Sequence, residues 1–330
     1  MPSGELISLE IRVDAILDKG LRMRSIRLSD TPGTLPLTET DTPQPKPHEG
    51  EVLIQVYAAG VTPDELGWYP TLHTKDGGKR IAAIPCHEFS GKVAALGDGV
   101  GGLSVGQEIY GMNDWFEDGA LAEYCVTQPD WIAVKPLRLS HAEAASVPIS
   151  ALTAWQGLFE RGQLQPGERV LVHGGAGGVG VYAIQLAHSI GAHVTTTVSP
   201  RNVAFVGALG ADEVVDYKAG PFEDKVRDID LVFDTVGGET LHRSWGLLKQ
   251  NGRLVTIASD SEAGSTERTK RAFFIVEPRH QELVEVGKLI DSGKLQPVVD
   301  TVLPFSQAAD AYMGKVVKKG RGKLVITVAA

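Results

Sequence analysis

The chain has 330 residues, of which 42% are hydrophobic and 22% charged, the composition of an ordinary globular protein long enough for two domains. Its formal charge is −9 and its lysines and arginines form no long run, so nucleic acid and anionic membrane surfaces are excluded as main partners. It has two cysteines, no apolar run of about 18 residues and no basic–apolar leader pattern, so we expect a cytoplasmic protein without disulfides or membrane spans.

The N-terminal part of the chain has the pattern of a β-rich domain. Residues 1–20 precede the first strand-like pattern, which begins near Met23, and we treat them as an N-terminal extension without an assigned role. From there to about Pro136, short strand-like runs alternate with glycine and proline turns, which predicts a compact barrel-like domain. The expected strands are 24–28, 51–57, 92–95, 108–112 and 120–126, with a proline-rich loop at 42–47.

From Ser140 onward, helix and strand patterns alternate. Ser140 and Glu143 have the spacing of a capping box, and a helical stretch is expected at 142–159. Six strand-like runs lie between Val170 and Val276, the last of them 272–276, which predicts a doubly wound parallel α/β sheet. The tail should add helices at 281–292 and 306–313 and a strand at 324–328. We therefore expect a β-rich domain at 1–148, an α/β domain at 149–278 and a return to the first domain at 279–330.

A glycine cluster between the first strand of this sheet and the next helix indicates the ligand. Gly175-x-Gly177-x-x-Gly180 fits the dinucleotide fingerprint, and a second strand at 193–198 completes the βαβ context that the motif requires. The glycines allow a tight turn and close approach of the backbone to a pyrophosphate, which the helix N-terminus then binds. The stretch from Arg169 to Tyr217 is therefore the predicted site of a dinucleotide cofactor.

The end of the second strand bears on which nicotinamide nucleotide binds. NAD-binding folds place a carboxylate about twenty residues beyond the glycines, where it contacts the ribose 2′-hydroxyl. Here Ser199 stands in that place and Arg201 follows. A hydroxyl and a guanidinium suit a 2′-phosphate through charge-assisted hydrogen bonds, so we predict NADP(H). An exposed arginine at the start of a helix is the alternative for Arg201, and the sequence context leaves it open.

The chain resembles the medium-chain dehydrogenase/reductase superfamily from Met23 to its C-terminus. The phrases that carry the resemblance are Ala59-Gly60-Val61, Pro85-Cys86-His87-Glu88-Phe89-Ser90-Gly91, Gly119-Ala120-Leu121-Ala122-Glu123-Tyr124, Ala151-Leu152-Thr153-Ala154-Trp155 and Gly210-Ala211-Asp212-Glu213-Val214-Val215-Asp216-Tyr217. Within the superfamily it is most similar to the zinc-independent NADPH:quinone oxidoreductases and their enone-reducing relatives. The resemblance implies a Rossmann sheet, a β-rich GroES-like barrel domain and a homodimer.

The resemblance also implies roles for individual residues. On the cofactor side these are Thr153, Gly175, Ala176, Gly177, Gly178, Val179, Gly180, Tyr217, Val236, Ala258, Phe274, Val276 and Lys323, in addition to Ser199 and Arg201. On the substrate side, Thr62 replaces the asparagine usual in quinone reductases, and Tyr69 or His73 is the candidate proton donor. Trp68, Trp115 and Phe116 are candidate walls for a flat acceptor, with plain packing as the alternative for each aromatic residue.

The ligand set of the zinc-binding relatives is incomplete in this sequence. Those relatives hold catalytic zinc with a Cys, a His and a second Cys, and structural zinc with four cysteines. His87 is present, but Thr62 stands at the first Cys position and the segment 148–151 has no thiol. We therefore predict no metal. Without a Lewis acid, quinones and α,β-unsaturated carbonyls are the expected hydride acceptors. A zinc-type alcohol dehydrogenase and a non-catalytic, crystallin-like NADPH-binding protein are the alternatives.

Overall fold

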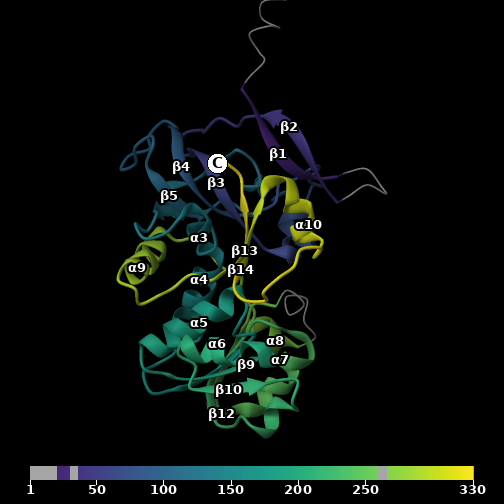
Figure 1. Ribbon diagram of the computed structural model, residues 1–330, viewed down its shortest axis with the longest axis vertical. Coiled ribbons are helices and arrows are strands. Elements are labelled where there is room, and N and C mark those ends of the chain that lie inside the picture. The colour runs from purple at the N-terminus through teal and green to yellow at the C-terminus, as the bar shows by residue number, and fades with distance from the viewer. Residues whose placement is uncertain (1–20, 30–35, 259–265, 330) are drawn as a thin grey trace, which may run out of the picture.

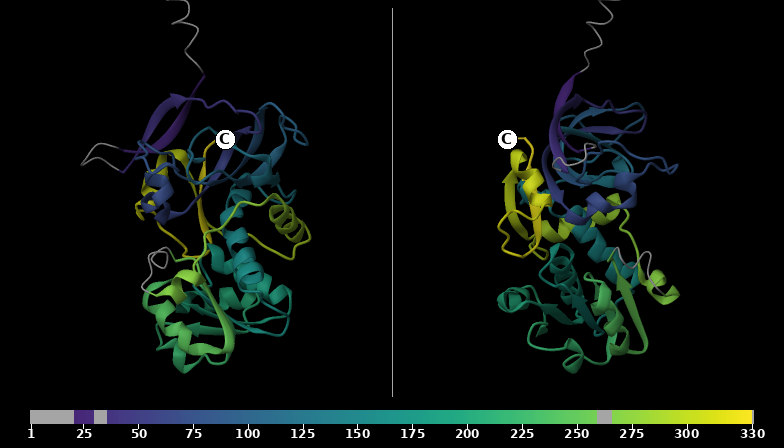
Figure 2. Two further views of the ribbon diagram at one scale, coloured as in Figure 1. Left: turned by 180° about the vertical axis from the view of Figure 1, so that it is seen from behind. Right: turned by 90° about the vertical axis from the view of Figure 1, so that its right-hand side faces the viewer.

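The computed structural model describes residues 21–29, 36–258 and 266–329. The molecule is elongated and has two lobes, and both ends of the described chain lie in the same lobe (Figure 1). The middle of the sequence forms the other lobe, and helices α4 and α5 lie where the lobes meet (Figures 1 and 2). The predicted extension at 1–20 lies outside the described residues.

The first lobe is built on a seven-stranded mixed sheet with the order β13-β14-β3-β4-β5-β7, to which β6 adds by pairing with β3. Strands β1 and β2 form a separate antiparallel ribbon. The strands of this lobe are β1 (Arg22–Leu28), β2 (Leu37–Pro43), β3 (Val52–Val61), β4 (Glu88–Leu96), β5 (Glu108–Met112), β6 (Tyr124–Thr127), β7 (Ile132–Val134), β13 (Val299–Pro304) and β14 (Lys323–Thr327). Its helices are η1 (Pro63–Gly67), α2 (Tyr69–Leu72), η2 (Pro129–Trp131), η8 (Phe305–Gln307) and α10 (Ala308–Tyr312).

The second lobe contains a five-stranded parallel sheet in the order β10-β9-β8-β11-β12. Its strands are β8 (Arg169–His173), β9 (His193–Val198), β10 (Glu213–Asp216), β11 (Ile229–Asp234) and β12 (Leu248–Thr256). Its helices are α5 (Gly178–Ser189), η4 (Pro200–Asn202), α6 (Val203–Ala208), η5 (Phe222–Asp224), α7 (Gly238–Ser244), η6 (Trp245–Leu247) and α8 (Glu267–Ala272). The α/β fold with a Rossmann sheet and a separate β-rich domain is thereby confirmed.

Helices α3 (His141–Ala145), α4 (Pro148–Trp155) and α9 (His280–Asp291), together with the π-helical turn η3 (Gln156–Arg161), connect the two lobes. The predicted capping box starts α3: the Glu143 amide donates to the Ser140 hydroxyl, and the Ser140 amide donates to the Glu143 carboxylate. One apolar core continues across the junction, because Tyr110 of β5 and Leu283 of α9 belong to the same buried cluster as Val170 of β8. The lobes therefore share a core rather than a wet interface.

The prediction of six strands in the parallel sheet was wrong. Ala272 ends α8, and only Phe273 continues the sheet, through a single parallel bridge to Thr256. Phe274 and Val276 are buried in the core cluster of the lobe junction instead of extending a ladder. Strands β2, β7 and β13 were not expected from the sequence, because their short runs alternate weakly or contain few apolar residues.

Candidate functional site

The glycine turn joins the end of β8 to the start of α5, at the carboxyl edge of the parallel sheet. A Cβ atom at Gly175 would clash with the Thr196 hydroxyl of β9, and one at Gly180 would clash with the Gly174 carbonyl oxygen. Glycine is therefore required at both positions for the close packing of strand and helix. Gly177 is the N-cap of α5, so the first amides of that helix are available to an anion. The turn thus has the backbone geometry that binds a pyrophosphate.

The C-terminal segment closes onto this turn. The Gly322 amide donates to the Ala176 carbonyl oxygen at 2.8 Å, and Gly322 forms a parallel bridge with Gly177. A Cβ atom at Gly178 would lie 3.9 Å from Cδ of Lys323, so the lysine stem passes beside the N-terminus of α5. The structure therefore brings Lys323, at the start of β14, to the predicted cofactor turn.

The ammonium of Lys323 points into the first lobe. It forms an ion pair with the Glu88 carboxylate at the start of β4 and donates to the Thr62 hydroxyl at 3.0 Å. The other Glu88 oxygen accepts the Ile149 amide, in the first turn of α4, at 2.9 Å. Burial raises the pKa of the Glu88 carboxyl, and the Lys323 charge opposes that rise. Glu88 and Lys323 are buried, whereas Thr62 is only half-buried.

The residues predicted at a 2′-phosphate lie together at the end of β9. Arg201 is exposed, Ser199 is half-buried, and Tyr217 is 52% exposed, with its amide bonded to the Val198 carbonyl oxygen. Arg321 was not predicted, but its guanidinium donates to the Arg201 carbonyl oxygen at 3.1 Å. Arg321 also donates to the Asn202 side-chain oxygen at 2.9 Å and lies over the Phe205 ring. The Arg321 guanidinium therefore lies against the backbone of Arg201 at this corner.

The remaining cofactor candidates differ in what their side chains are free to do. The Thr153 hydroxyl is buried and donates to the Ile149 carbonyl oxygen of its own helix at 2.5 Å. Val236 is 54% exposed, and its amide donates to the Asp234 carboxylate at 3.1 Å. Val179 is half-buried and lies in the first turn of α5. Among the candidates that follow β12, Ala258 is half-buried, and Phe274 and Val276 are buried.

The aromatic candidates fall into two groups. Trp68 and Trp115 make an edge-to-face contact with ring centroids 5.4 Å apart, and Trp115 lies 5.2 Å from the His87 ring. Tyr69 and His73 stack on each other at 4.2 Å, and Tyr69 is 55% exposed. The two possible proton donors therefore form a stacked pair of an exposed tyrosine and a half-buried histidine, whereas Trp115 packs against His87.

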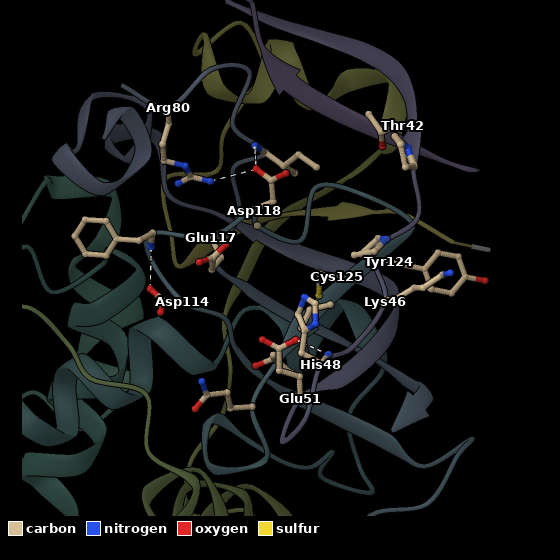
Figure 3. Close-up of a pocket in the computed structure, with 18 of the residues that line it drawn as sticks. Thr42, Lys46, His48, Glu51, Arg80, Asp114, Glu117, Asp118, Tyr124 and Cys125 are labelled. Atoms are coloured by element: carbon tan, nitrogen blue, oxygen red, sulfur yellow. Dashed lines mark hydrogen bonds and ion pairs between the residues drawn. The ribbon is translucent and has the colours of Figure 1, made fainter. Parts of the chain in front are cut away.

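Trp115 and Phe116 do not form one wall. Phe116 lines a cavity of about 910 Å³ between the β1–β2 ribbon and the 113–119 turn (Figure 3). That cavity is lined mainly by charged and polar side chains, including Arg80, Asp114 and Asp118, and no residue of the glycine turn lines it. Asp118 accepts from Arg80 and from the Ile84 amide, which fixes the turn. This cavity is therefore separate from the predicted cofactor turn.

The His87 imidazole is buried and both of its nitrogens face oxygen atoms. Nδ1 lies 3.0 Å from Glu65 Oε2, and Nε2 lies 3.2 Å from the Glu117 carbonyl oxygen. A carbonyl oxygen only accepts, so Nε2 must carry a hydrogen. Glu65, a residue that the sequence did not single out, also accepts from the Cys86 amide and the Tyr312 hydroxyl. Neither nitrogen of His87 presents a free lone pair to a metal.

Comparison with known proteins places this architecture in a family. The alcohol dehydrogenase GroES-like domain family matches residues 48–137, and a family described as zinc-binding dehydrogenase matches residues 209–326. A mitochondrial NAD(P)H oxidoreductase of Danio rerio is 31% identical over 327 residues, covering 85% of this chain and 84% of the relative. A 2-methylene-furan-3-one reductase of Solanum lycopersicum is 34% identical over 304 residues, covering 87% and 74%.

The solved structure of a quinone oxidoreductase from Coxiella burnetii matches with a TM-score of 0.85 and 31% identity, covering 94% of this chain and 100% of the other. Among the described residues, no helix has the length and apolar character needed to cross a membrane. The order of domains, the glycine turn and these relatives agree. The chain belongs to the medium-chain dehydrogenase/reductase superfamily and is an oxidoreductase of the quinone oxidoreductase-like group.

Proposed function

We propose that the protein is an NADPH-dependent reductase of quinones or α,β-unsaturated carbonyls that works without zinc. The observation that carries the proposal is the glycine turn, opened at the N-terminus of α5 and closed by the segment of Gly322 and Lys323 from the other lobe. This arrangement supports the proposal that a dinucleotide binds between the two sheets. The names of the relatives, a quinone oxidoreductase and an enone-type reductase, support the acceptor class.

The preference for NADPH is supported by the corner at the end of β9. Ser199, Arg201 and Arg321 offer a hydroxyl and two guanidinium groups where a 2′-phosphate of a bound nucleotide would lie. Asp216, at the end of the neighbouring β10, is already bonded to the Lys218 amide. NADH, which lacks the phosphate, gains nothing from the two charges.

The absence of zinc is supported by the chemistry of the side chains at the zinc-ligand positions. Thr62 accepts from an ammonium, and both nitrogens of His87 are engaged by oxygen atoms. No group of three or more His, Cys, Asp or Glu side chains suited to a metal occurs among residues 21–29, 36–258 and 266–329. Cys86 is buried, and burial raises the pKa of its thiol well above the usual range, which disfavours the thiolate that zinc binds. A zinc ion does not fit these residues.

Bound NADPH would supply the hydride, and the chain's own residues would bind it, orient it and exclude water. The α5 N-terminus and the glycine turn would hold the pyrophosphate. The tryptophan pair of Trp68 and Trp115 would form the closed side of an acceptor pocket in which a flat, apolar ring is favoured over water. Quinones and enones accept a hydride without a metal to polarise them, which agrees with a pocket formed by aromatic side chains and without metal ligands.

The test follows NADPH oxidation with 1,4-benzoquinone and with but-3-en-2-one, each repeated with NADH. We expect turnover with at least one acceptor and a preference for NADPH. The variant Arg201→Asp should lose NADPH affinity at least tenfold while NADH binding is retained, and Arg227→Asp, at an exposed position elsewhere, is the matched control. Binding of NADPH without oxidation by any acceptor would favour the non-catalytic alternative. Stoichiometric zinc in the purified protein would favour the alcohol dehydrogenase alternative.

Assembly and location belong to the same proposal. We propose a homodimer formed at the β12 edge of the parallel sheet, where Ile275 is 53% exposed, and light scattering that shows only monomer would reject it. We also propose a cytoplasmic location, supported by two buried free cysteines, with import into isolated mitochondria as the opposing result. The proposed domain boundaries remain 1–148, 149–278 and 279–330.

A further inference from the structure

Three side chains from distant parts of the sequence form one line at the ends of β3, β4 and β14. Glu88 is buried at one end, Lys323 lies in the middle, and Thr62 is the half-buried end. Val61, directly before Thr62, pairs with Leu324, directly after Lys323, so the sheet register places the two residues side by side. The line lies between the mixed sheet and the first turn of α4, whose Ile149 amide binds Glu88.

The direction of the hydrogen bonds in this line is determined by the groups themselves. An ammonium can only donate, so Lys323 donates to the Thr62 oxygen and the Thr62 hydrogen must point elsewhere. Among the described residues, the Thr62 hydroxyl has no hydrogen-bond acceptor. A hydroxyl whose oxygen accepts from a cation is a stronger donor than an isolated one. Thr62 therefore offers a polarised O–H group at the accessible end of a buried ion pair.

We propose that Thr62 and Lys323 form an oxyanion site: the Thr62 hydroxyl donates to the acceptor's oxygen, and Lys323 supplies the positive charge behind it. This rests on the proposed function. When a hydride adds to the acceptor, an electron pair moves to the carbonyl or quinone oxygen, and that oxygen becomes negative. The charge is stabilised through the Thr62 O–H···O bond, and the oxygen or α-carbon then takes its proton from solvent. Thr62 is the catalytic residue, and Lys323 acts through it as a positioning and polarising residue.

The other candidate donors are less suited to this role. The Thr153 hydroxyl is already bonded to the Ile149 carbonyl oxygen. His87 Nε2 donates to the Glu117 carbonyl oxygen, and its Nδ1 faces Glu65. Tyr69 stacks on His73 on an exposed segment and has no positive group behind its hydroxyl among its contacts in the described structure. A cation combined with a hydroxyl free to donate occurs at Thr62.

The first test compares Thr62→Val with Thr62→Ser. Valine keeps the shape of threonine without the hydroxyl, so kcat should fall by about 10²- to 10³-fold, the usual loss of an oxyanion donor. Serine keeps the hydroxyl and should retain kcat within about tenfold. Thr38→Val, in the separate β1–β2 ribbon, is the matched control for the same substitution in a half-buried position. If the wild type reduces quinones and Thr62→Val has the same kcat and KM as the wild type, the oxyanion site is wrong. The proposed function would not be affected by that result.

A second readout does not depend on turnover. In the presence of NADP⁺, 4-nitrophenol serves as a probe because its ionised form absorbs near 400 nm and imitates the negative oxygen. Wild-type protein should bind the phenolate and lower the apparent pKa of the probe, whereas Thr62→Val should bind the neutral phenol. Equal probe ionisation in the two proteins would contradict an oxyanion site. Failure of the wild type to oxidise NADPH at all would instead reject the proposed function.

The role of Lys323 needs a variant that still folds, because Lys323→Met leaves Glu88 buried without its partner. The double variant Lys323→Met/Glu88→Gln removes both charges and avoids that penalty. Its kcat should fall about as far as that of Thr62→Val, and adding Thr62→Val should cause little further loss, because the two residues act as one unit. If the double variant loses NADPH affinity with kcat unchanged, Lys323 serves the cofactor and not Thr62, and the proposal is wrong for Lys323.

Discussion

His173 is the last residue of β8 and lies directly before the glycine turn, and its titration should make the stability of the protein depend on pH. The side chain is fully buried: Nδ1 lies 2.9 Å from the Thr197 hydroxyl and Nε2 2.9 Å from the Ser244 hydroxyl. Ser244 donates to the Thr240 carbonyl oxygen, so it accepts from Nε2, and Nδ1 accepts from Thr197. This arrangement satisfies the neutral imidazole, and a second proton on Nδ1 would require the Thr197 hydroxyl to give up its donation.

Burial lowers the pKa of His173 from 6.5 to about 4, with the nearby Arg243 adding to the shift. Because the unfolded chain takes up this proton at a higher pH than the folded protein, the stability is complete above about pH 6.5 and is lost as pH falls toward 4. At about 1.4 kcal/mol per pH unit, His173 alone should cost about 2 kcal/mol of unfolding free energy between pH 8 and pH 5. The assay is urea unfolding at both pH values.

The variant His173→Gln cannot take up the proton, so its loss between pH 8 and pH 5 should be smaller than that of the wild type by about 2 kcal/mol. Comparing each variant with itself at two pH values removes the packing cost of the substitution. His188→Gln, at an exposed position of α5, is the control and should behave as the wild type. If wild type and His173→Gln lose the same stability, the buried neutral imidazole inferred from the hydrogen bonds is wrong.

Three further predictions concern the cofactor turn, the 2′-phosphate corner and the lobe junction. Gly180→Ala should lower nucleotide affinity at least tenfold, because the added Cβ would meet the Gly174 carbonyl oxygen. Fluorescence titration with NADPH measures the affinity, and an unchanged value would contradict the close packing of strand and helix. Arg321→Ala should raise the Kd for NADPH about tenfold and leave the Kd for NADH unchanged in the same titration. Equal effects on both nucleotides would mean that Arg321 does not contact the phosphate. Burial raises the pKa of Glu282 to about 7, so the folded protein keeps a proton that the unfolded chain releases near 4.5, and stability present below pH 4.5 is lost as pH rises through 7. Between pH 5 and pH 8 the unfolding free energy of Glu282→Gln should therefore rise by about 1 kcal/mol more than that of the wild type, after allowance for solvent screening. Urea unfolding of both proteins at both pH values measures this, and equal changes in the two would refute it.

The features that could be predicted from the sequence are those that depend on neighbours along the chain. The capping box of Ser140 and Glu143 and the glycine turn both follow from residues a few positions apart, and both occur in the structure. The parallel sheet followed from the alternation of apolar strands and helices. Strand β13 (Val299–Pro304) was missed because it is stabilised by pairing with β14 and not by a strong pattern of its own.

The contacts within the candidate site could not be predicted in the same way. Thr62 and Lys323 are 261 positions apart in the chain, and their hydrogen bond depends on the register of two strands. Trp115 and Phe116 are adjacent, yet one packs on His87 and the other lines the polar cavity, because a turn sends consecutive side chains in different directions. No sequence motif included Arg321, and only its contact with Arg201 associates it with the phosphate corner.

The contact of Gly322 with the glycine turn has a consequence for the order in which the site can form during folding. The turn joins two neighbouring elements of the second lobe, but the amide that bonds Ala176 comes from the segment that enters β14, a strand of the first lobe. The turn can therefore form from local contacts, whereas its cover requires β14 to pair with β3, a contact between segments far apart in the sequence. The second lobe folded by itself would keep the glycine turn and lack the cover over it.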